Sequence, residues 1–115
     1  EEVIDATTTK VEDPLIEKIV ELVKANLQNP EFNVKSLADM LFMSQPTLYR
    51  KVKQITGFTI IELVRGVRLK EAAELLKTKQ YGIQEVSEMV GYNDVPTFRK
   101  HFVALYGTTP STFAG

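Results

Sequence analysis

Apolar residues recur three and four positions apart along most of this 115-residue chain, which is the spacing that places them on one face of an α-helix. The first such stretch spans residues 14–27, where Asp13 and Pro14 suit the N-cap and the first helical position. The Asn29-Pro30 pair is expected to end it. Its apolar stripe consists of Ile16, Ile19, Val20, Val23 and Leu27. The whole pattern predicts an all-α fold of about seven helices.

The pattern of residues 44–57 returns at residues 94–107. Both segments contain a Pro-Thr pair near the start and a glycine at the end, and the apolar positions 48, 52 and 55 align with 98, 102 and 105. An internal repeat of this kind indicates two copies of one supersecondary unit. Each copy is predicted to be a short helix, a tight turn and a second helix.

In the first copy the short helix is expected at about residues 36–42, followed by a turn at Met43 and by Ser44 as the N-cap of the second helix. In the second copy the short helix carries Ile83, Val86, Ser87 and Val90, and Asp94 is the expected cap. Gly91 begins the second turn and suits a positive φ. Phe42 stands at the equivalent place in the first copy.

One long helix, about residues 60–77, is predicted between the copies. Thr59 and Glu62 form a capping box that fixes its start. Its broad apolar coverage predicts contact with both copies, and its length gives a rod of about 27 Å. Such a rod could hold the second helices about one turn of B-DNA apart, roughly 34 Å.

The second helix of each copy has an apolar face and an opposite polar face. A capped helix that follows a tight turn and carries Arg, Lys and hydrogen-bonding groups on its outer face is how a helix-turn-helix presents its recognition helix to the major groove. An ordinary solvated face is the alternative for a single copy, but two copies in register favour DNA. A helical protein-interaction module remains the rival interpretation, kept open by the apolar character of Pro46, Tyr49 and Val95.

These residues resemble the DNA-binding domain of the arabinose-regulator (AraC/XylS) transcription factors over about residues 14–113. In the first half the matching residues are Leu37, Ala38, Met43, Ser44, Leu48, Arg50, Lys53 and Gly57, and in the middle Arg68, Leu69, Ala72, Leu75 and Leu76. In the second half they are Ile83, Val86, Val90, Gly91, Tyr92, Phe98, Phe102, Gly107, Pro110 and Phe113. Ser87 and Ala114 depart from the family pattern, which usually has Ala and Arg there.

The resemblance implies a sequence-specific DNA-binding domain of a bacterial transcription regulator. It divides the chain into a first helix-turn-helix lobe (14–57), a linker helix (59–77) and a second lobe (82–115). The base-reading residues expected from it and from the outer faces are Gln45, Pro46, Tyr49, Arg50, Val95, Pro96, Arg99 and Lys100. The expected phosphate contacts are Ser44, Thr47, Lys51, Lys53, Thr97 and His101. Val95 and Pro96 are apolar, so they suit thymine methyl groups.

The net charge of −1 is at first sight unsuited to a DNA-binding protein. Residues 1–44 carry 4 Lys/Arg and 9 Asp/Glu, a balance of −5, whereas residues 45–115 carry 10 and 6, a balance of +4. The positive charge therefore lies in the part of the chain that contains both recognition helices, where phosphate affinity depends on it.

Enzymatic function is not expected, because His101 is the only His, the chain has no Cys and no Gly-rich phosphate loop is present. No metal or cofactor is predicted. Met40, Met43 and Met89 lie in helical stripes and are expected to fill the core. The absence of Cys fits a reducing compartment, no segment approaches the length of a membrane span, and we expect a cytoplasmic protein without membrane contact.

Residues 1–13 show no periodicity and are expected to be a linker to a region that precedes them. This acidic start resembles the linkers of hybrid two-component regulators. The resemblance implies a larger regulator with a sensor or dimerisation region, double-stranded promoter DNA as the partner, and RNA polymerase as a further partner.

Overall fold

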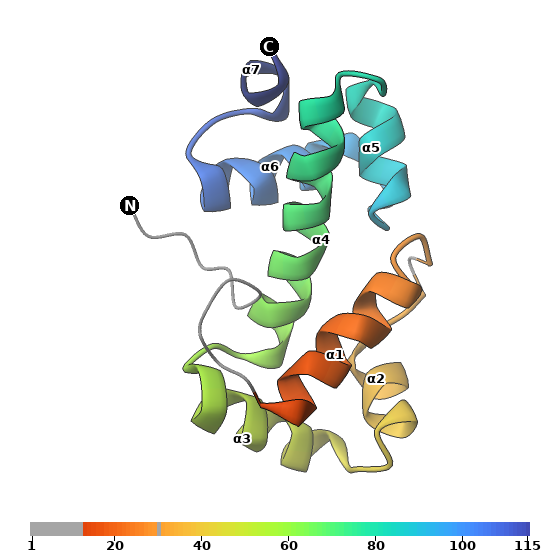
Figure 1. The fold of residues 1–115 in the computed structure, drawn as a ribbon, viewed down its shortest axis with the longest axis vertical. Helices are drawn as coiled ribbons and strands as arrows, with labels where there is room; N and C mark the ends of the chain where they lie inside the picture. The colour runs from red at the N-terminus through yellow and green to blue at the C-terminus, as the bar shows by residue number, and fades with distance from the viewer. Residues whose placement is uncertain (1–12, 30) are drawn as a thin grey trace.

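The computed structural model describes residues 13–29 and 31–115, and this part of the chain contains seven α-helices and no β-strand (Figure 1). The helices are α1 (Pro14–Ala25), α2 (Val34–Met40), α3 (Gln45–Thr56), α4 (Ile60–Thr78), α5 (Ile83–Met89), α6 (Val95–Tyr106) and α7 (Pro110–Ala114). The all-α prediction is confirmed. Twelve of the thirteen residues that we expect to be a linker lie outside the described part, so that prediction is not tested. Pro30 also lies outside it, but the first helix already ends at Ala25, so the Asn29-Pro30 pair does not end it.

Helix α4 is the axis of the molecule, with α1, α2 and α3 around its first half and α5, α6 and α7 around its second half (Figure 1). Its 19 residues make a rod of about 28 Å. The predicted capping box is present, with the Thr59 hydroxyl accepting from the Glu62 N–H at 3.1 Å and the Glu62 carboxylate accepting from the Thr59 N–H at 2.9 Å.

Two apolar cores divide the surface of α4 between them. Ile60, Leu63 and Val67 belong to the first core, and Leu69, Ala72, Ala73 and Leu76 belong to the second. The remaining buried members of the first core are Ile16, Ile19, Val23, Phe32, Leu37, Ala38, Leu48 and Val52, and those of the second are Val86, Val90, Phe98 and Phe102. The expectation that the long helix contacts both lobes is confirmed.

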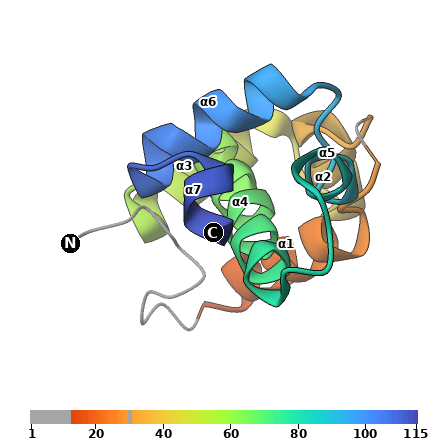
Figure 2. The same cartoon turned by 90° about the horizontal axis from the view of Figure 1, so that it is seen from above.

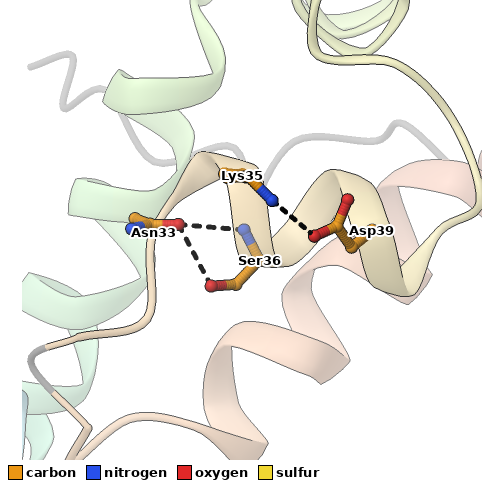
Figure 3. A network of polar contacts seen from close by, with 4 residues as sticks. All are labelled: Asn33, Lys35, Ser36 and Asp39. Atoms are coloured by element: carbon orange, nitrogen blue, oxygen red, sulfur yellow. Dashed lines mark hydrogen bonds and ion pairs between the residues drawn. The ribbon is translucent and has the colours of Figure 1, made fainter.

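Helix α2 is shifted by two residues from its predicted range. It begins at Val34 because the side chain of Asn33 accepts the Ser36 N–H at 2.9 Å and so acts as the N-cap (Figure 3). An ion pair of 3.1 Å between Lys35 and Asp39 spans one turn of the same helix (Figure 3). The helix ends at Met40 because Phe42 adopts a positive φ of 57°, which an α-helix does not accommodate.

Two further predictions are wrong near helix ends. Helix α1 stops at Ala25 rather than at residue 27, because the Asn26 side chain donates to the Leu22 carbonyl at 2.8 Å and caps it. Met40 does not fill the core, since its side chain is 43% exposed at the end of α2. Both errors concern the last turn of a helix, where side-chain capping competes with continued winding.

A buried arginine joins the two lobes. Arg68 of α4 is only 8% exposed, and its Nη1 donates to the carbonyl oxygens of Leu27 and Val90, each at 2.7 Å. Burial lowers the pKa of its guanidinium from the ordinary value, while the neighbouring Tyr92 acts in the opposite direction. Gly91, next to Val90, has the positive φ that its position in the turn predicted, 92°.

Candidate nucleic-acid interface

Helices α3 and α6 are built in the same way, as the repeat predicts. Each has 12 residues, a proline at its second position and a glycine in the left-handed conformation after its last residue. The Ser44 hydroxyl accepts the Thr47 N–H at 3.2 Å, and an Asp94 carboxylate oxygen accepts the Thr97 N–H at 2.7 Å. Each cap therefore satisfies one backbone N–H of the first turn of its helix.

The buried residues of these helices fix which face points outward. Leu48 and Val52 of α3 are fully buried in the first core, and Phe98 and Phe102 of α6 are fully buried in the second. Phe98 packs against the ring of Tyr92 with their centroids 5.4 Å apart. Because the inner face is held by this packing, the opposite face cannot rotate away from solvent without breaking the core.

The structure places the predicted base-reading residues on two outward faces. Gln45, Pro46, Tyr49 and Arg50 are exposed on α3, with Tyr49 at 39%. Pro96, Arg99 and Lys100 are exposed on α6, whereas Val95 is partly buried. The two helices cross α4 near its opposite ends, and both lie on the side of α4 away from α1 (Figures 1 and 2).

Several predicted phosphate contacts already have a partner within the domain. The Ser44 hydroxyl donates to Thr47 Oγ1 at 2.9 Å, which leaves the hydrogen of the Thr47 hydroxyl free for another acceptor. Lys53 donates to the Gly57 carbonyl at 2.9 Å and retains two further N–H groups. Lys51 and Thr97 are exposed.

His101 differs from these residues because it faces the middle of the molecule. Its Nδ1 lies 2.9 Å from the Tyr92 hydroxyl, and its ring is partly buried. Burial lowers the pKa of His101, and the charges of Arg65 and Lys100 lower it further. Burial also raises the pKa of Tyr92 to about 12, against the opposing effect of Arg65 and Arg68.

The charge of the two outer faces is uniform. Neither α3 nor α6 contains Asp or Glu, whereas α3 carries Arg50, Lys51 and Lys53 and α6 carries Arg99 and Lys100. The ion pairs Lys18–Glu21, Lys35–Asp39 and Glu74–Lys77 lie on other helices. The cations of the interface are thus available to an external anion.

Asp94 directly precedes α6 in the sequence, and its carboxylate caps the N-terminus of that helix. Hydrogen bonds from the Thr97 backbone and side chain lower its pKa below the ordinary value, and burial opposes this slightly. The carboxylate therefore satisfies the first turn of α6 and partly cancels the positive charge at that helix terminus.

Arg65 and Arg68 have no role predicted from the sequence, although Arg68 is among the residues of the family resemblance. A signal for Arg68 exists, because it is a charged residue set among the buried positions of α4. Its two acceptors are 41 and 22 residues away in sequence, so the sequence could not identify them.

No group of His, Asp and Glu side chains within residues 13–29 and 31–115 is arranged to hold a metal ion. None of the helices in the described part combines the length and apolar content needed to cross a membrane.

Comparison with known proteins places this arrangement in a family. A family of helix-turn-helix domains matches residues 37–115, and a Mga helix-turn-helix domain family matches residues 15–58. The probable transcription factor PqrA of Proteus vulgaris is 31% identical over 100 residues, which cover 86% of this chain and 82% of that protein.

Two larger relatives contain a similar segment. Histidine kinase P4 of Formosa agariphila is 33% identical over 109 residues, 95% of this chain but 8% of the kinase. The transcriptional regulatory protein YesN of Bacillus subtilis is 35% identical over 102 residues, 86% of this chain and 28% of YesN. The chain thus spans less than a third of either protein.

Two solved structures of transcription regulators have folds similar to this chain. The C-terminal domain of AraT, a response regulator from Geobacillus stearothermophilus, has a TM-score of 0.81 at 26% identity, covering 92% of this chain and 87% of that one. The DNA-binding domain of the transcriptional factor AdpA, solved with a target DNA, has a TM-score of 0.79 at 28% identity, covering 90% and 91%. The chain belongs to the AraC-type helix-turn-helix family of transcription regulators, and it is a DNA-binding domain of that family.

Proposed function

We propose that this domain recognises a specific promoter sequence by placing α3 in one major groove segment and α6 in the next. The observation that carries the proposal is the matched construction of the two helices, each capped, free of carboxylates and exposed on the same side of α4 (Figure 2). A rod of about 28 Å supports insertion into successive segments that are about 34 Å apart.

Base recognition is assigned to the outer faces of the N-terminal halves. Arg50 is equivalent to Lys100 in the repeat and Arg99 is equivalent to Tyr49, and the guanidinium of Arg50 or of Arg99 can donate two hydrogen bonds to guanine. Gln45 offers an amide suited to adenine. Pro46, Tyr49, Val95 and Pro96 supply apolar contacts, which suit thymine methyl groups.

Phosphate binding is assigned to the flanks of the same helices. Lys51, Lys53 and Lys100 supply charge, and Thr47 and Thr97 supply hydroxyl groups next to the helix N-termini. These contacts set the orientation of the domain on the duplex without selecting a sequence.

The domain is further proposed to be the output part of a cytoplasmic two-component regulator whose other regions sense a signal or dimerise. The names of its relatives support this, since P4 is a histidine kinase and AraT a response regulator. RNA polymerase is the proposed partner at the promoter, because transcription regulators act on initiation there.

The test is selection of bound sequences from a random DNA pool, followed by footprinting of the selected site. We expect a common sequence without two-fold symmetry, protected over about two helical turns by one domain, and affinity that falls steeply as salt rises. Lys18→Gln on α1, away from the interface, is the charge-matched control and should leave the affinity unchanged. A pool without a common sequence, combined with a flat salt response, would favour a protein-interaction module instead.

A further inference from the structure

A cleft of about 270 Å³ lies between the two lobes. Its walls come from the start of α2, the middle of α4, the turn before α6 and α6 itself, and they include Asn33, Arg65, Arg68, Tyr92 and His101. A second hollow, between α4 and α6, shares Arg65 and His101 with the first and is also lined by Ala104. Arg65 and His101 therefore lie at the boundary between the two hollows.

The location is on the interface side of the molecule. Arg65 lines the second hollow together with residues of α6, so its side chain lies on the side of α4 that carries α6. Helix α3 lies on that same side at the other end of α4 (Figures 1 and 2). Arg65 and His101 thus line the hollows between the two lobes, on the side of α4 that carries α6.

The chemistry of this place suits an anion. Arg65 is exposed, and it is absent from the ion pairs and hydrogen bonds of the described residues. The first cleft has no carboxylate in its lining. Glu62, which lines the second hollow, has its carboxylate bonded to the Thr59 backbone in the capping box.

His101 adds a directed donor. The Tyr92 hydroxyl lies 2.9 Å from Nδ1 and occupies that nitrogen, so Nε2 is the ring nitrogen left for an external partner. A neutral imidazole that accepts at Nδ1 carries its hydrogen on Nε2. Arg68 contributes positive charge, and its two hydrogen bonds from Nη1, to Leu27 and Val90, are made within the protein.

We propose that Arg65 and the Nε2–H of His101 together bind one phosphate of the DNA backbone between the two groove segments occupied by α3 and α6. This inference rests on the proposed function. A duplex that runs from α3 to α6 must pass its backbone across the middle of α4, and this unpaired guanidinium is the charged group that meets it there. The site is a third anchor, separate from those of the two recognition helices.

The experiment measures affinity of the whole chain for its selected site across a salt series. Arg65→Gln should weaken binding on the order of tenfold, equally for the selected and an unrelated duplex, and should reduce the log–log salt slope by about 1. His101→Phe should also weaken binding, while His101→Gln, which retains a side-chain N–H, should weaken it less. Lys24→Gln, on α1 at the other side of α4, removes the same charge and should change neither quantity.

Duplexes with a single neutral methylphosphonate identify the phosphate. One backbone position between the two groove segments should weaken binding by the wild-type chain and have no further effect on Arg65→Gln. Urea denaturation checks that each variant is folded. Binding of the selected site with an unchanged slope for Arg65→Gln would overturn this inference alone, whereas absence of specific binding by the wild-type chain would overturn the proposed function itself.

Discussion

Substitution of Gly91 by alanine tests the junction between the lobes most directly. A Cβ atom at this position would lie 1.9 Å from Arg68 Nη1 and 2.4 Å from the Leu27 carbonyl oxygen. Neither distance is possible between unbonded heavy atoms. The guanidinium would therefore have to move, and its hydrogen bonds to Leu27 and Val90 would be lost or lengthened.

The expected destabilisation is the sum of two effects. An L-residue in the left-handed region costs about 1–2 kcal/mol. Loss of a buried hydrogen bond to a charged group costs about 1.5–3 kcal/mol, and Arg68 is buried enough that solvent does not reduce this figure. Gly91→Ala should therefore lower the free energy of unfolding by about 2.5–5 kcal/mol.

The chain offers a matched control at Gly107, where φ is 74° and an added Cβ would meet no atom within 4 Å. Gly107→Ala should show only the backbone cost, about 1–2 kcal/mol. Urea denaturation followed by circular dichroism gives both values. If the two substitutions cost the same, the steric argument is refuted. The same conclusion follows if the effects of Gly91→Ala and Arg68→Ala simply add, because removal of the guanidinium should relieve much of the clash.

Three other predictions concern binding and pH. Arg50→Ala should cost about 1–3 kcal/mol in affinity and relax the preference at one or two base pairs; an equal loss for every sequence in a binding assay would make Arg50 a phosphate contact. One alanine inserted before Gly66 should rotate the lobes by about 100° and abolish binding of the selected site while circular dichroism shows nearly unchanged helix content; retained affinity would mean that one lobe suffices. The folded-state pKa of Asp94 is lowered by its bonds to Thr97, so its stabilising effect is present above the unfolded-state pKa of about 3.9 and is lost as pH falls through the lower folded value. Thermal melting in acid should therefore depend less on pH for Asp94→Asn than for the wild type, and identical profiles would contradict the capping role.

The repeat and the two recognition helices could be predicted from sequence because their determinants are local. Ser44 and Asp94 cap the helices that they precede, and the apolar residues at 48 and 98 are buried as their spacing requires. A cap, a proline and a terminal glycine act within one or two turns, so the order of residues contains the whole signal. The cap and the terminal glycine of each helix set the boundaries of α3 and α6.

The errors arise where local signals compete or distant groups decide. Asn33 caps α2 before the predicted start, and Phe42 takes the left-handed conformation that glycine takes in the second turn, with its side chain 96% exposed. The pairing of Arg68 with carbonyl groups of both lobes, and the meeting of Arg65 with His101, depend on tertiary packing. Patterns of apolar spacing contain no information about such contacts.

Because α4 supplies residues to both cores, the border between the lobes falls inside one helix and not at a linker. A fragment that ends after α4 would present Leu69, Ala72 and Leu76 to water, and a fragment that begins with α5 would lack one wall of its core. The two halves, alike as they are, are consequently not separable modules. Removal of one lobe would leave an apolar, aggregation-prone surface, so we expect the pair to unfold as a unit.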